Sequence, residues 1–168
     1  VIFLFCKFTE IFCYRQIWNL MKLNLPAFDY RLRRDRDGVK IFDRLRLKYV
    51  AVTPEEWVRQ HFIEYLITHK GYPASLMANE VGITLNGTRR RCDSIVVDHS
   101  GNTVMIIEYK APEVTISQMT FDQIVRYNMV LHARYLIVSN GLNHYCCAID
   151  YDHSPYRFLP DIPDYDKL

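Results

Sequence analysis

Residues 80–112 read EVGITLNGTRRRCDSIVVDHSGNTVMIIEYKAP, and this stretch decides the fold. Its apolar segments at 94–97 and 104–107 are rich in β-branched residues, which favour strands. Turn-forming residues bound these segments at 86–87, an Asn-Gly pair, and at 99–102. The pattern predicts three antiparallel strands joined by two short turns.

The two turns also predict a register. A two-residue loop at 86–87 and a four-residue loop at 99–102 place Glu80 opposite Asp93, and Asp93 opposite Glu108. Directly opposed side chains have Cβ atoms about 5 Å apart. Three carboxylates would therefore form a row across one face of the sheet.

Such a row is unfavourable unless a cation fills it. Two like charges 4 Å apart repel by about 4 kcal/mol at an effective dielectric constant of about 20. Because oxygen ligands of this kind suit Mg²⁺ or Mn²⁺, we expect one of these metals in the row. A bulge at Gly82 or Cys92 would shift the register and disperse the three carboxylates.

Basic residues lie beside this row. Lys110 is one pair further along the same face, opposite Arg91, so a basic end could face an anion. Arg89, Arg90 and Arg91 are candidate phosphate contacts. A second basic cluster at 31–46 is either solvated surface or a nucleic-acid contact.

Composition sets broad limits. A chain of 168 residues suits one domain, and 49% hydrophobic with 24% charged residues is ordinary for a globular protein. The net charge of +2 does not by itself indicate nucleic-acid binding. Five cysteines without a C-x-x-C pair indicate reduced thiols in a cytoplasmic protein, and the spacing at 144–153 argues against zinc.

Two helices are expected around the three strands. Thr53 and Pro54 form a helix start, and that helix runs to about His69. A second helix at about 117–133 precedes a short strand at 135–139, and a further strand follows at 143–149. The second helix permits a parallel crossover. Its expected core stripe is Phe121, Ile124, Val125 and Met129.

Several motifs now carry a family resemblance. Asp93, followed after a hairpin by Glu108-Tyr109-Lys110, is similar to the D…(D/E)-x-K signature of the PD-(D/E)XK nuclease superfamily. More closely, roughly residues 21–165 resemble the N-terminal nuclease domain of type I restriction enzyme R proteins. The motifs are TPEEWVRQ at 53–60, NEV at 79–81, RCD at 91–93, IEYKAP at 107–112, FDQIVRYN at 121–128 and VSNG at 138–141.

The resemblance implies a fold and a domain organisation. The fold would be an α/β restriction-endonuclease-like three-layer sandwich, with a mixed sheet and an αβββαβ core. The nuclease-like core would span residues 51–150, preceded by an arm at 21–50 and followed by a tail at 151–168 packed on the core. Residues 1–20 are expected to be a non-native or dispensable extension, because the resemblance begins only after Met21. They are also too short and too charged to span a membrane.

The resemblance also implies an activity, that of a Mg²⁺-dependent or Mn²⁺-dependent DNA endonuclease of restriction or defence type. Asp93 and Glu108 would hold the metal, with Glu80 or Glu56 as a further ligand. Glu56 is equally explained as the carboxylate that caps its own helix. Lys110 would position the attacking water or neutralise growing charge on the phosphate.

Gln123 and Tyr127 complete the catalytic set that the resemblance implies. They lie four residues apart on the second helix and match a Q-x-x-x-Y element that orients the substrate or the lysine. Two polar residues at a helix edge are the plainer interpretation.

Two departures keep other functions open. Cys92 stands where the superfamily often has proline, and the chain contains no G-x-x-x-x-G-K-[ST] loop and hence no ATP site. DNA, and restriction-modification or helicase subunits, are the expected partners. The alternatives are a non-catalytic nucleic-acid-binding or partner-docking module that retains the fold, and a structural protein whose carboxylate row is misregistered.

Overall fold

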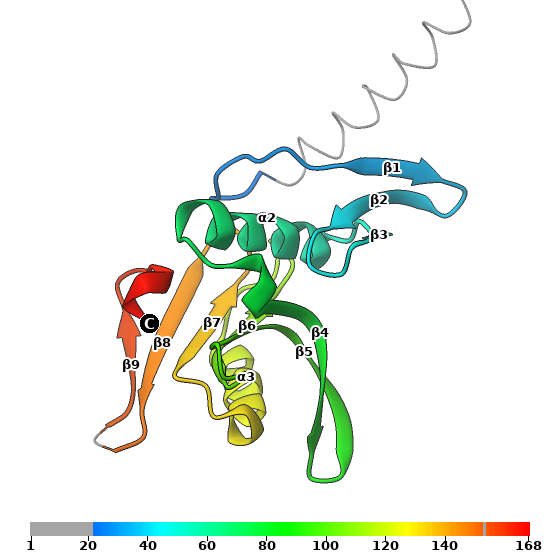
Figure 1. Cartoon of the computed structure of the whole chain (residues 1–168). Helices are drawn as coiled ribbons and strands as arrows, with labels where there is room; N and C mark the ends of the chain where they lie inside the picture. The colour runs from blue at the N-terminus through cyan, green and yellow to red at the C-terminus, as the bar shows by residue number, and fades with distance from the viewer. Residues whose placement is uncertain (1–21, 153) are drawn as a thin grey trace, which may run out of the picture.

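The computed structural model describes residues 22–152 and 154–168, so the expectation for residues 1–20 lies outside the described residues. Its centre is a six-stranded sheet in which each strand pairs with the next one in the sequence (Figure 1). The strands are β4 (Met77–Leu85), β5 (Thr88–Val97), β6 (Thr103–Tyr109), β7 (Tyr135–Ser139), β8 (His144–Asp150) and β9 (Ser154–Leu159).

The sheet is mixed. β6 and β7 run parallel, and every other neighbouring pair of the six strands is antiparallel. The connection from β6 to β7 passes through helix α3 (Gln118–Leu131), as parallel neighbours require a crossover. The helical crossover that the sequence permits is therefore present.

The predicted register is confirmed on both sides of the candidate site. Asn79 pairs with Ser94 and Val81 pairs with Cys92, while Ser94 pairs in turn with Ile107. Asn86 and Gly87 have φ values of 49° and 74°, as a type I′ hairpin turn needs. The bulge considered at Gly82 or Cys92 does not occur, because both residues are paired in register.

The two helices begin where the sequence predicts. Helix α2 (Pro54–His69) starts after Thr53, whose side-chain oxygen accepts a hydrogen bond of 3.1 Å from the backbone N–H of Glu56. Helix α3 starts after Ser117 with a capping box. N-cap interactions of this kind each stabilise a helix by about 1 kcal/mol.

The helices pack on opposite faces of the sheet. Phe62 and Leu66 of α2 lie in one apolar cluster with Met105 and Ile107 of β6. The intervening residue Ile106 lies in a second cluster on the α3 side, with Ile124, Leu136 and Val138. Because alternate residues of a strand point to opposite faces, the domain has a helix, sheet and helix layer. This α/β arrangement is consistent with the predicted sandwich, whose restriction-endonuclease type stays a prediction.

The expected core stripe of α3 is partly wrong. Ile124 is fully buried and Phe121 packs against the same cluster, but Val125 is 46% exposed and Met129 is 66% exposed. An apolar stripe at helical spacing shows which side of a helix faces a sheet. It does not show how far the sheet extends beneath that side.

The N-terminal arm contains more structure than the sequence predicts. It forms a three-stranded sheet of β1 (Leu32–Asp35), β2 (Gly38–Asp43) and β3 (Lys48–Ala51). Ahead of it, the backbone N–H of Asn24 donates a 2.7 Å hydrogen bond to the carbonyl of Gly141, after β7. The arm thus contacts the core at a site far along the chain.

The C-terminal segment is also more ordered than a surface tail. It contributes β9 to the sheet edge and ends in a short 3₁₀ helix, Tyr165–Lys167. Ile162 is buried, and Tyr165 and Leu168 pack against the α2-side cluster. None of the helices among the described residues is long and apolar enough to cross a membrane.

Candidate active site

Asp93 and Glu108 lie beside one another where β5 and β6 stop pairing. Ser94 and Ile107 are the last paired residues, so the strands diverge just beyond them. Asp93 is 8% exposed and Glu108 is 3% exposed. Asp93 is held in place because its Oδ2 accepts a 2.9 Å hydrogen bond from the backbone N–H of Tyr109.

Two of the other predicted catalytic residues contact Glu108, and a third contacts one of these two. Lys110 Nζ lies 2.8 Å from Glu108 Oε1, and Gln123 Nε2 donates to the same oxygen at 2.5 Å. Gln123 Nε2 also lies 3.2 Å from Tyr127 Oη. The structure therefore brings Asp93, Glu108, Lys110, Gln123 and Tyr127 into one polar site that joins β5, β6 and α3.

The second oxygen of Glu108 is the unusual atom of this site. Oε2 is buried and has no hydrogen-bond partner among the described residues. Burial, together with the nearby charge of Asp93, raises the pKa of Glu108 to about 7, although Lys110 opposes this rise. Burial raises the pKa of Asp93 as well, against the effect of Arg59.

Lys110 remains a cation in this site. Burial by itself lowers the pKa of its ammonium, but the hydrogen bond to Glu108 and the charges of Glu108 and Asp93 raise it above its ordinary value. The prediction that Lys110 pairs opposite Arg91 is wrong. β6 ends at Tyr109, and Arg91 pairs with Gly82 on the other side of β5.

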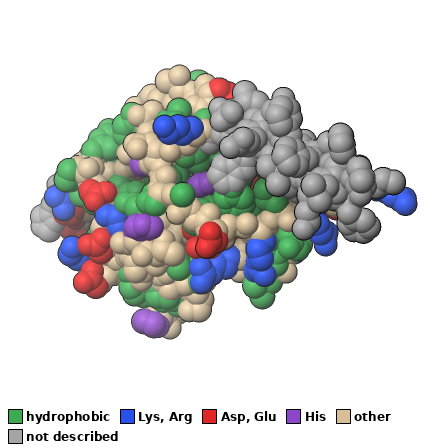
Figure 2. All heavy atoms as spheres, turned by 90° about the horizontal axis from the view of Figure 1, so that it is seen from above, with side chains coloured by type: hydrophobic (Ala, Val, Ile, Leu, Met, Phe, Trp, Pro, Cys, Tyr) green, Lys and Arg blue, Asp and Glu red, His purple; other side chains and the backbone are tan. Residues whose placement is uncertain are grey.

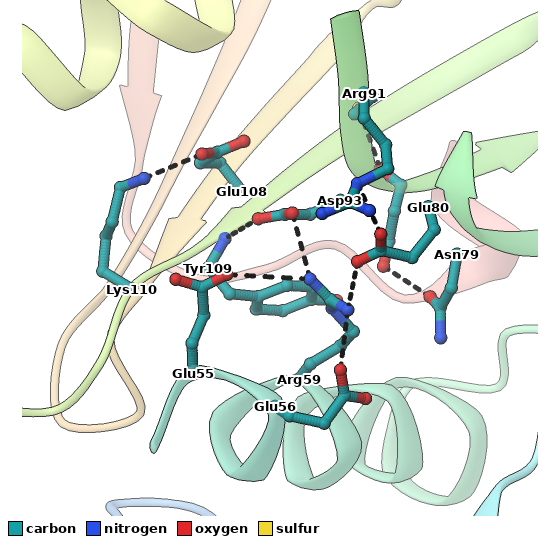
Figure 3. Close-up of polar contacts among 12 residues, drawn as sticks. Glu55, Glu56, Arg59, Asn79, Glu80, Arg91, Asp93, Glu108, Tyr109 and Lys110 are labelled. Atoms are coloured by element: carbon teal, nitrogen blue, oxygen red, sulfur yellow. Dashed lines mark hydrogen bonds and ion pairs between the residues drawn. The ribbon is translucent and has the colours of Figure 1, made fainter. Parts of the chain in front are cut away.

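Arg59 occupies the centre of the acidic group and was not predicted from the sequence (Figure 3). Its guanidinium lies 2.8 Å from Glu56 Oε2, 2.5 Å from Glu80 Oε1 and 3.0 Å from Asp93 Oδ1. Burial lowers its pKa, but these carboxylates more than compensate, so Arg59 stays charged. The carboxylates therefore do surround a cation, which is the guanidinium of Arg59 from α2.

Glu80 faces this arginine and is not paired opposite Asp93. It has a positive φ of 59°, and the ladder between β4 and β5 skips the position where it would pair with Asp93. Its second oxygen, Oε2, lies 2.5 Å from Arg91 Nε. The expected single row of three carboxylates is therefore divided at Asp93, because the distorted backbone turns Glu80 toward Arg59 and Arg91.

Glu56 is occupied in the same way. Its Oε1 accepts hydrogen bonds from Arg46 at 2.8 Å and from Gln60 at 2.7 Å, while Oε2 faces Arg59. The neighbouring Glu55 is the acidic residue of α2 that reaches the site, and its charge contributes to the raised pKa of Glu108. Figure 3 shows Glu55 between the start of α2 and Tyr109.

The donor set fits a divalent cation at Asp93 and Glu108. In the described residues, no group of three or more His, Cys, Asp or Glu side chains gathers closely enough to suggest a metal site. The unpartnered Glu108 Oε2 is nevertheless an oxygen ligand without a donor, next to a second carboxylate that raises its pKa. Hard cations bind such oxygen ligands. Metal binding by Asp93, Glu108, Glu80 and Glu56 stays a prediction, and the geometry favours the first two.

The three consecutive arginines differ in their surroundings. All three are exposed, and Arg91 pairs with Glu80. Arg90 lines a cavity together with Gln123 and Tyr127. Their contact with DNA stays a prediction.

Comparison with known proteins identifies the family of the chain. No curated protein matches the chain. The family described as "Type I restriction enzyme R protein N terminus (HSDR_N)" matches residues 54–163, which is more than half of the chain and includes every predicted site residue. The chain therefore belongs to the family of the type I restriction enzyme R protein N terminus, a nuclease-type domain.

Proposed function

We propose that this domain is a metal-dependent DNA endonuclease of restriction type that hydrolyses phosphodiester bonds. One observation carries the proposal. Glu108 receives Lys110 and Gln123 on one oxygen, while its other oxygen is buried without a partner next to Asp93. A carboxylate that is costly to bury, with one free oxygen, is typical of a site that binds a cation.

Asp93 and Glu108 would hold Mg²⁺ or Mn²⁺ through their free lone pairs. When bound, such an ion polarises a scissile phosphate and makes a water molecule easier to deprotonate. Arg59 and the backbone N–H of Tyr109 fix the orientation of Asp93. These contacts hold one ligand in place before any cation arrives.

Lys110 would act on the phosphate. Its ammonium stays protonated next to Glu108, so it can stabilise the negative charge that develops on the phosphate oxygens. Gln123 holds Glu108 through one oxygen and contacts Tyr127, which ties the orientation of that carboxylate to α3. Gln123 and Tyr127 are positioning residues in this proposal.

The proposed biological context is restriction or a related defence against foreign DNA, in the cytoplasm. DNA would be the substrate, and restriction-modification or helicase subunits would be partners. Because the sequence contains no G-x-x-x-x-G-K-[ST] loop, ATP-driven movement along DNA would be supplied from outside these 168 residues.

Calorimetric titration with Mn²⁺, followed by incubation with supercoiled plasmid DNA, tests the proposal. We expect the parent domain to bind Mn²⁺ and nick the plasmid, and Glu108→Gln to lose both properties. Glu80→Gln is the matched control, because Glu80 faces Arg59 and Arg91, and this variant should still bind the metal. Metal binding that is unchanged in Glu108→Gln would overturn the assignment.

Lys110→Met separates catalysis from metal binding. We expect this variant to bind Mn²⁺ at least as well as the parent, because a competing cation next to Glu108 is removed, and to leave the plasmid uncut. DNA binding without nicking by the parent at any Mn²⁺ concentration would instead support a non-catalytic module.

A further inference from the structure

A cavity of about 340 Å³ adjoins the candidate active site on the α3 side. It is bounded by the β4–β5 hairpin and by α3, which neighbour one another in Figure 1. The residues that line it are Leu85, Arg90, Gln123, Arg126 and Tyr127. Two of the five are arginines, and they come from different elements.

These two arginines differ from the other arginines near the site. Arg46, Arg59 and Arg91 each pair with a carboxylate. In the part of the chain that the structure describes, neither Arg90 nor Arg126 forms an ion pair. Two like charges that line the same cavity repel each other, so an anion between them is favourable.

Arg126 has an orientation suited to this role. Its Nε donates a 3.0 Å hydrogen bond to the backbone carbonyl of Asp122 on the preceding turn of α3. This contact restricts the guanidinium and leaves its two terminal nitrogens available. Guanidinium groups match phosphate oxygens with paired hydrogen bonds, which an ammonium group cannot do.

The cavity is connected to the candidate catalytic carboxylate. Gln123 and Tyr127 line it, and Gln123 donates to Glu108 Oε1. A group in the cavity would therefore lie one side chain away from Glu108. On the face seen from above, Figure 2 shows basic and acidic side chains interspersed.

We propose that Arg90 and Arg126 bind a backbone phosphate of the strand that is cut, near its scissile phosphate, and so determine which bond reaches Glu108. This inference rests on the proposed nuclease function and adds a strand-positioning subsite to it. Leu85 and the ring of Tyr127 would provide an apolar wall for the adjoining sugar. Neither arginine is a catalytic residue here, because both act by placing the strand.

Binding is tested first, in chelator-containing buffer where no cleavage occurs. The probes are an end-labelled single-stranded oligonucleotide and its duplex, titrated at several salt concentrations. The variant is Arg90→Gln/Arg126→Gln. The control is Arg134→Gln/Arg157→Gln, which removes the same charge from a different cavity, at β8 and β9.

We expect the Arg90/Arg126 variant to bind at least about tenfold more weakly than the control, since a hydrogen bond to a charged group contributes about 1.5–3 kcal/mol. The dependence of log K on log salt should also become shallower, by about 0.7–0.9 for one lost phosphate contact. Equal affinities of the two double variants would overturn the inference.

Cleavage then tests the position. Oligonucleotides that carry one neutral methylphosphonate at successive positions are cut by the parent with Mn²⁺. We expect one neutral linkage, at a fixed offset from the cut, to reduce the rate in the parent and the control but not in Arg90→Gln/Arg126→Gln. If the neutral linkage at that offset still reduces the cleavage rate of Arg90→Gln/Arg126→Gln, the subsite is wrong.

The two readouts separate this inference from the function on which it rests. If the parent cuts DNA and both double variants bind and cut alike, the subsite is wrong and the nuclease stands. If the parent does not cut but the Arg90/Arg126 variant alone loses binding, the nuclease is wrong and a phosphate-binding cavity remains.

Discussion

Replacing Arg59 with methionine tests whether its guanidinium holds the acidic group together. Arg59 is 3% exposed and contacts Glu56, Glu80 and Asp93 at 2.5–3.0 Å. Removing one partner of a buried ion pair costs about 3–5 kcal/mol, because the remaining charge stays buried and unpaired. With three carboxylates left behind, we expect a loss near the upper value, about 5 kcal/mol at neutral pH.

The loss should depend on pH. Arg59 opposes the rise that burial causes in the pKa of Asp93, so this pKa should rise further in the variant. A group whose pKa is raised in the folded state favours folding when protonated, and that contribution is lost as the pH rises through the folded pKa. The deficit of Arg59→Met should therefore shrink as the pH is lowered toward about 4.

Urea unfolding followed by circular dichroism measures both effects. In thermal unfolding of a domain of this size, 1 kcal/mol corresponds to about 2–4 °C in Tm. The expected loss of about 5 kcal/mol would therefore lower the Tm by about 10–20 °C. Arg44→Met is the control, because Arg44 is half exposed and pairs with Glu64 at 3.1 Å; its loss should cost less than about 1 kcal/mol. An unfolding free energy for Arg59→Met within about 1 kcal/mol of the parent would refute this reasoning.

Three other substitutions test separate features. In metal-free buffer Glu108→Gln should be more stable than the parent at about pH 8 but not at about pH 5. The pKa of Glu108 is raised to about 7, so its ionised form is unfavourable in the folded protein above that pH. Equal pH profiles of the two proteins in urea unfolding would contradict this. Gly141→Ala should lower the stability more than Gly87→Ala, because both glycines have positive φ but only at Gly141 would a Cβ lie 2.6 Å from the Leu23 side chain. Thermal unfolding compares the two variants, and equal losses of Tm would count against that contact. Asn128→Ala should lower Tm by several degrees because it removes the side chain whose amide and carbonyl both bond to the backbone of Ala133, and an unchanged melting curve would oppose this.

Local signals in the sequence predicted the helix starts and the hairpin well. Thr53 followed by Pro54, and Asn86 followed by Gly87, fix backbone conformation through contacts within a few residues. The structure shows these features at the predicted positions. Asp93 and Glu108 were brought together by the same reasoning, because only a short turn separates their strands.

The features that were missed depend on distant parts of the chain. Arg59 is held by two carboxylates of the sheet, Glu80 and Asp93, and by carboxylates of its own helix. Its spacings of four residues from Glu55 and three from Glu56 were the local signals. The positive φ of Glu80, which turns this residue toward Arg59 and Arg91, has no such signal. Strands β1, β3 and β9 were missed because polar, aromatic and proline-containing edge segments lack a clear alternating pattern.

The sequential order of strands in the main sheet has a consequence for how this protein is made. Each strand from β5 to β9 pairs with the strand that precedes it, so the sheet can grow strand by strand as the chain leaves the ribosome. β5 and β6 would bring Asp93 and Glu108 together before α3 is synthesised. The carboxylate pair would exist in the nascent chain earlier than Gln123 and Tyr127, which later fix its geometry.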